Sequence, residues 1–228
     1  MRDLLESILR QTHKDWEILI VDSPFNRNKI LETIALFGDP RLRYLQANTT
    51  SINILKNTAL EQLSFESEWV IFLEQETRLS PDALAFFQES LLKKPGIEWL
   101  ATNYALRDGT SLAHGKDGEL YSYSLDYLLQ KRLCGTMLHV VKIKSINKLR
   151  FPRRIKGTGS WIFFFKFGQK RKLLYVDHNS AIRTERSINR FTFTEAFFEE
   201  MILQGLWKNP LFLITAIMLF LFPKQVDL

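Results

Sequence analysis

Carboxylates stand directly after two apolar runs in the first half of the chain. Asp22 follows residues 16–21 (WEILIV). Glu74 follows residues 68–73 (EWVIFL), and Glu76 lies two positions further along the chain. Two carboxylates one residue apart can hold Mg²⁺ or Mn²⁺ together with a diphosphate, because these ions take oxygen ligands. A plain acidic loop and an ordinary aspartate at a strand end are the structural alternatives.

These residues must be positioned by the elements around them. Short apolar runs alternate with segments of helical spacing, separated by turn residues, which is typical of an α/β fold with a mostly parallel sheet and helices on both faces. In such sheets ligands bind outside the carboxyl ends of the strands, where Asp22, Glu74 and Glu76 are expected. We predict helices over residues 3–10, 29–37, 52–63 and 80–93, and strands over residues 16–21, 41–47, 68–73 and 97–106.

The second half is less regular. We predict a helix over residues 124–131, strands over 135–142 and 172–176 with Asp177 just after the second, an aromatic segment over 161–167, and a helix over 193–206. We expect one α/β domain over residues 1–190 and a helical tail over residues 191–228. The tail contains twelve continuous apolar residues, 211–222, whereas a membrane span needs roughly 20. A helix in the membrane interface, one packed on a partner, a core or dimer helix, and a true span all stay open.

Charge is distributed unevenly along the chain. The net charge is +6, but residues 127–176 contain 13 Lys or Arg and no Asp or Glu. This imbalance favours an anionic partner, such as a phosphate-bearing substrate or an acidic membrane face, with a solvated basic surface as the alternative. No nucleic-acid-binding motif accompanies the basic and aromatic residues of 161–172, so we expect no nucleic acid partner. A single cysteine, Cys134, excludes an internal disulfide and favours a reducing, cytoplasmic setting.

Read together, these segments resemble family 2 glycosyltransferases. The resemblance is carried by the register of several short motifs over residues 7–84, and it continues more weakly over residues 134–189. The motifs are residues 7–12 (SILRQT), 16–22 (WEILIVD), 39–44 (DPRLRY), Asn48 with Lys56 and Asn57, residues 72–76 (FLEQE) and residues 79–84 (LSPDAL).

The resemblance implies a GT-A fold and an inverting transfer from a nucleoside-diphosphate sugar, usually a UDP-sugar, with a divalent metal. It implies that the nucleotide is bound by Asp22, Lys56, Asn57 and Gln75, with Asp22 accepting a hydrogen bond from the base. Glu74 and Glu76 would then hold Mg²⁺ or Mn²⁺. The expected acceptor is a cell-surface polysaccharide or a lipid-linked molecule, reached from the inner face of the cytoplasmic membrane, where the basic stretch and the apolar tail would act as a peripheral attachment.

The sequence also departs from the family pattern. The chain begins inside the helix that follows the family's first strand, so we expect that strand to be missing, as in a truncated protein. Glu74-Gln75-Glu76 replaces a run of aspartates, and Ser160 stands where the family carries its catalytic base, an aspartate. Serine is no base at neutral pH without a partner. The alternative function is therefore an inactive member or remnant that serves as a nucleotide-sugar-binding or assembly module.

Overall fold

The computed structural model describes residues 1–153 and 159–183. The tail expected over residues 191–228 lies outside these residues, and so do the helix expected over 193–206 and the apolar run 211–222. Within the described ranges, no helix is long and apolar enough to cross a membrane.

The first half forms the helices and strands expected up to residue 106, with somewhat different bounds. One short strand, β4, was not expected. The elements are α1 (Arg2–Leu9), β1 (Ile18–Asp22), the 3₁₀ turn η1 (Pro24–Asn26), α2 (Arg27–Phe37), β2 (Leu42–Gln46), α3 (Ile52–Glu61), β3 (Trp69–Ile71), β4 (Thr77–Leu79), α4 (Ala83–Lys93) and β5 (Trp99–Ala105).

The second half differs more from the expectation. The aromatic segment forms a helix, and the strand expected over residues 172–176 runs on to Arg183, so Asp177 lies inside it and not after it. The elements are β6 (Ala113–His114), β7 (Leu120–Tyr121), the π-helix η2 (Tyr123–Leu129), β8 (Cys134–Gly135), β9 (Met137–Lys142), α5 (Ile143–Ile146), α6 (Ser160–Gly168) and β10 (Leu173–Arg183).

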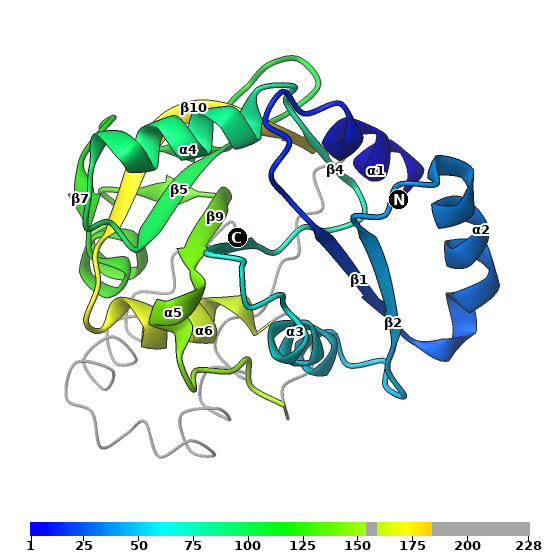
Figure 1. Cartoon of the computed structure of the whole chain (residues 1–228). Helices are drawn as coiled ribbons and strands as arrows, with labels where there is room; N and C mark the ends of the chain where they lie inside the picture. Colours follow the sequence, from blue (N-terminus) through cyan, green and yellow to red (C-terminus); the bar gives the residue numbers. More distant parts are fainter. Residues whose placement is uncertain (154–158, 184–228) are drawn as a thin grey trace.

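The α/β class is confirmed, but the prediction of a mostly parallel sheet is wrong. The larger sheet has the order β3-β9-β5-β10-β4, with β7 also paired to β10. β5 and β10 are parallel, whereas β9 runs antiparallel to both β3 and β5. β1 and β2 form a separate parallel pair (Figure 1). The sheet is mixed because β9, which lies between β3 and β5, runs antiparallel to both, and β4 and β7 run antiparallel to β10.

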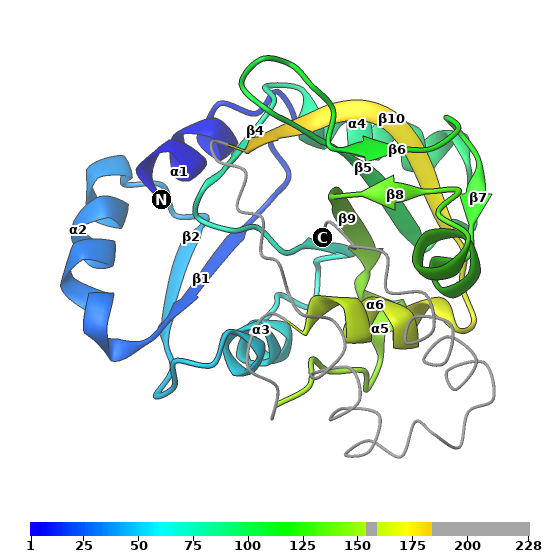
Figure 2. The ribbon, with the colours of Figure 1, turned by 180° about the vertical axis from the view of Figure 1, so that it is seen from behind.

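Both faces of the larger sheet are covered, because its strands carry apolar side chains on alternate sides. In β5, Trp99 and Ala101 belong to a core shared with η2 and α6, whereas Leu100 and Tyr104 belong to a core shared with α1 and α4. The two views show α4 on one side of this sheet and α5 and α6 near the opposite end of β9 (Figures 1 and 2). Because α6 packs against one face of the sheet, the sheet sets the position of this helix relative to the strand ends.

Helix α6 is the most deeply buried helix among the described residues, so truncating it tests the packing. Phe163 is fully buried, and its ring stacks on Phe151 with a centroid distance of 4.2 Å. We expect Phe163→Ala to lower the free energy of unfolding by about 3–5 kcal/mol, because it leaves a cavity. Urea denaturation followed by circular dichroism measures this. The control is Phe65→Ala, whose side chain is 95% exposed, with an expected change within about 0.5 kcal/mol. Similar losses in both variants would contradict this packing.

Candidate functional site

Asp22 is the last residue of β1 and lies opposite Gln46 of β2. Its backbone oxygen accepts a hydrogen bond from the amide of Ala47 at 2.9 Å. Its side-chain oxygen Oδ2 is buried and has no hydrogen-bond partner among the residues that the structure describes. A buried carboxylate oxygen without a donor is costly, so this end of β1 is suited to a ligand that brings an N–H group.

The acidic loop follows β3 and leads into β4. Glu74 forms an ion pair with Arg183 at the end of β10. Gln75 and Glu76 are exposed, and the Gln75 amide donates a hydrogen bond to a Glu76 carboxylate oxygen at 2.8 Å. Arg183 was not expected at this site. It lies 109 residues from Glu74 in the sequence, and no local pattern links the two.

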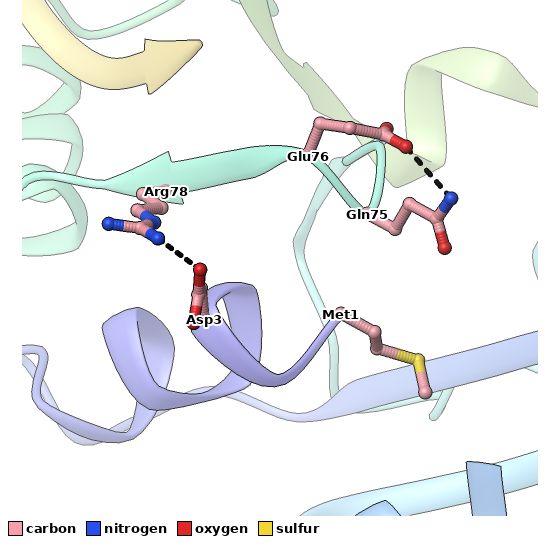
Figure 3. Close-up of a pocket in the computed structure, with 5 residues that line it drawn as sticks. All are labelled: Met1, Asp3, Gln75, Glu76 and Arg78. Atoms are coloured by element: carbon pink, nitrogen blue, oxygen red, sulfur yellow. Dashed lines mark hydrogen bonds and ion pairs between the residues drawn. The ribbon is translucent and has the colours of Figure 1, made fainter. Parts of the chain in front are cut away.

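A polar hollow lies between this loop and the start of α1. Figure 3 shows Met1 and Asp3 on the α1 side, facing Gln75, Glu76 and Arg78. Asp3 and Arg78 form an ion pair across it. The hollow therefore joins the amino end of the chain to the acidic loop that the sequence predicted as a metal and nucleotide site.

The donor atoms of the loop fit Mg²⁺ or Mn²⁺ in kind, because Glu74, Gln75 and Glu76 all carry side-chain oxygens. Within the described ranges, no group of three or more His, Cys, Asp or Glu is arranged to hold a metal. A metal here would depend on oxygens from a bound diphosphate, and it would compete with Arg183 for Glu74. Binding of a metal by Glu74 and Glu76 stays a prediction.

Lys56 and Ser160 meet between α3 and α6. The Lys56 ammonium nitrogen donates a hydrogen bond to Ser160 Oγ at 3.0 Å, and it lies 5.1 Å from the centroid of the Phe151 ring and 6.0 Å from that of Phe72. Burial lowers the pKa of Lys56 below its ordinary value, and the charge of the nearby Glu74 carboxylate partly opposes this. The sequence predicts Lys56 as a nucleotide-binding residue and aligns Ser160 with the family's catalytic base, but it predicts no contact between the two.

Asn57, the next residue of α3, is buried and forms hydrogen bonds to the backbone of Phe151. Its Nδ2 donates to the Phe151 carbonyl oxygen at 2.9 Å, and the Phe151 amide donates to its Oδ1 at 2.8 Å. The structure thus gives Asn57 a positioning role. Contacts of Asn57, Lys56 and Gln75 with a nucleotide stay predictions.

Asp177 forms hydrogen bonds with residues of β5 and of the segment around Asp117. It accepts a hydrogen bond from the Asn103 amide at 2.5 Å, and its own backbone amide donates to Asp117 at 2.9 Å. Tyr175 also donates to the side chain of Asn103, and burial is the first cause that raises its pKa to about 12. This cluster ties β10 to β5 and the segment around Asp117.

Known proteins similar to this chain are glycosyltransferases. No protein-family model matches the chain. It is 25% identical over 179 residues to TuaG of Bacillus subtilis (strain 168), assigned to teichuronic acid biosynthesis as a glycosyltransferase, covering 74% of this chain and 68% of TuaG. It is 26% identical over 152 residues to the Escherichia coli UDP-Glc:alpha-D-GlcNAc-diphosphoundecaprenol beta-1,3-glucosyltransferase WfgD, covering 65% of this chain and 57% of WfgD.

Solved structures of S. aureus TarS share the fold. The crystal structure of TarS residues 1–349 superposes with a TM-score of 0.68 at 19% identity, covering 96% of this chain and 67% of that structure. The same TarS fragment in complex with UDP gives a TM-score of 0.65 at 20% identity, covering 90% of this chain and 60% of that structure. The chain thus spans about two thirds or less of these proteins. The resemblance to family 2 glycosyltransferases is confirmed, and the fold is that of a GT-A protein.

Proposed function

We propose that this chain is the nucleotide-sugar-binding domain of a glycosyltransferase that acts on a cell-surface polysaccharide or a lipid-linked acceptor. The observation that carries the proposal is the unpartnered, buried Oδ2 of Asp22 at the carboxyl end of β1. A nucleotide base carries the N–H donor that this oxygen lacks. The similarity to TuaG and WfgD, and to TarS in complex with UDP, supports UDP as the nucleotide.

The positions of Asp22, Glu74 and Glu76 at the strand ends indicate how the proposed transfer would proceed. With the base at Asp22, the diphosphate would extend toward Glu74 and Glu76, where bound Mg²⁺ or Mn²⁺ would neutralise its charge. In an inverting transfer, the acceptor oxygen attacks the anomeric carbon as the bond to the phosphate breaks, and the nucleoside diphosphate leaves. Glu74 would have to exchange Arg183 for the metal.

The basic stretch, residues 127–176, supports an anionic acceptor. A lipid-linked diphosphate acceptor, like the one in the name of WfgD, carries negative charge next to an acidic bilayer surface. The 13 Lys and Arg residues would attract both, at the inner face of the cytoplasmic membrane. We extend this proposal to a transferase domain over residues 1–190 and a membrane-associated tail over residues 191–228.

A second candidate is a nucleotide-sugar-binding or assembly module without transfer activity. The ion pair between Glu74 and Arg183 favours it, because this pair occupies a carboxylate that a metal would need. The absence of any carboxylate from residues 127–176, around Ser160, also favours it. Both candidates require nucleotide binding at Asp22, and they differ in the need for metal.

Nucleotide binding is tested at Asp22. We expect Asp22→Ala to weaken UDP binding by about 10- to 150-fold, the value of a hydrogen bond to a charged group. Calorimetric titration of the purified chain with UDP measures this. Asp15→Ala, an equal change at an exposed aspartate outside the site, should leave the affinity unchanged. Unchanged binding in Asp22→Ala would place the nucleotide elsewhere.

The metal is tested by repeating the titration with and without Mn²⁺. We expect Mn²⁺ to increase the UDP affinity of the unmodified chain at least about tenfold, roughly 1.4 kcal/mol. In the double variant Glu74→Gln, Glu76→Gln, we expect Mn²⁺ to leave the UDP affinity unchanged. Glu89→Gln, on the exposed face of α4, is the matched control. UDP binding that does not respond to Mn²⁺ would support the module without transfer activity.

A further inference from the structure

The contact between Lys56 and Ser160 lies where the family pattern has its catalytic base. We propose that Ser160 contacts the acceptor hydroxyl and passes its proton to Lys56, so that this pair takes the place of the missing carboxylate. The inference rests on the proposed transferase function and assigns the proton acceptor for that reaction.

The geometry brings the two groups within transfer distance. Lys56 Nζ and Ser160 Oγ are 3.0 Å apart, which is direct hydrogen-bond distance. Both residues are partly exposed, so the pair is not sealed within the core. Asn57, the neighbour of Lys56 in α3, forms two hydrogen bonds to the Phe151 backbone, and the Phe151 ring stacks on Phe163 of α6 with a centroid distance of 4.2 Å.

The groups around Lys56 act on its charge in opposite directions. Ser160 is the first residue of the nine-residue helix α6, and the positive end of a helix dipole repels an ammonium group. The aromatic faces of Phe72 and Phe151 line the other sides and favour the cation. The nearest carboxylate named by its charge effect is Glu74, which follows β3 and is already paired with Arg183.

The direction of the pKa shift agrees with this balance. Burial lowers the pKa of Lys56, and it outweighs the opposite effect of Glu74. A lowered pKa increases the fraction of neutral amine near neutral pH, and only the neutral amine can accept a proton. Transfer should therefore increase as the pH rises through the pKa of Lys56.

The proposed step balances as follows. The acceptor hydroxyl gives its proton to Ser160 Oγ while the Ser160 hydroxyl gives its own proton to neutral Lys56, which becomes an ammonium group. The acceptor oxygen forms its bond to the anomeric carbon. The bond from that carbon to the phosphate oxygen breaks, and its electron pair leaves with the nucleoside diphosphate.

The first experiment follows the amine itself. The chain is labelled with ¹³C at lysine Cε, and the Lys56 signal is assigned by its loss in Lys56→Arg. We expect it to titrate below the ordinary lysine pKa of about 10.4 and to shift in Ser160→Ala. A Lys56 signal that titrates at the ordinary lysine pKa would overturn the proposal without any activity assay.

The second experiment measures UDP release from a panel of UDP-sugars over a range of pH. We expect Lys56→Met and Ser160→Ala to lower kcat by about 10²- to 10⁴-fold, with unchanged UDP affinity in Ser160→Ala, and we expect Ser160→Thr to restore part of the lost kcat. Lys56→Arg keeps the charge but cannot give up its proton, so it should stay inactive. Lys29→Met is the control with normal kcat.

The outcomes separate this inference from the proposed function. A loss in Ser160→Ala that lies in UDP affinity and not in kcat would make this residue a nucleotide contact, which overturns the proton transfer and leaves the proposed function intact. UDP binding by the unmodified chain without turnover of any donor would overturn the proton transfer and favour the binding module. No UDP binding at all would contradict the proposed function itself.

Discussion

The structure of the candidate site depends on one paired contact between the two halves of the chain. Asn57, in α3, exchanges two hydrogen bonds with the backbone of Phe151, 94 residues away. An amide side chain that pairs with a backbone N–H and C=O imitates a strand ladder and leaves little freedom in position or angle. The Phe151 ring in turn stacks on Phe163, so this contact connects α3 with the aromatic core around α6.

The larger sheet adds a second constraint, on the position of α6. β5, β9 and β10 carry apolar side chains on both faces, so each face needs helical cover. α1 and α4 supply it on one side, and η2 and α6 supply it on the other. Packing against the sheet therefore sets the position of α6, and with it the position of its first residue, Ser160.

The sequence predicted local elements well and long-range pairing poorly. The first hundred residues alternate apolar runs with turn residues, and their helices and strands follow from that pattern. The position of β9 between β3 and β5 could not be read from it, because an antiparallel strand and a parallel one have the same short-range sequence. The same limit explains Asp177, which was expected just after the strand. It lies inside β10 because it bonds to Asn103 and Asp117, which are distant in the sequence.

The site shows the same division between local and distant information. Asp22 and Glu74 could be identified as candidates because each follows an apolar strand. The ion pair of Glu74 with Arg183 and the contact of Lys56 with Ser160 join residues more than 100 positions apart, and only the fold reveals them. One property of the sequence nevertheless connects them to the proposed chemistry. A stretch with 13 basic residues and no carboxylate attracts an anionic acceptor, but it cannot supply a carboxylate base. The composition that would bind the acceptor therefore requires that the group which takes its proton come from outside the stretch, and Lys56, in contact with Ser160, is such a group.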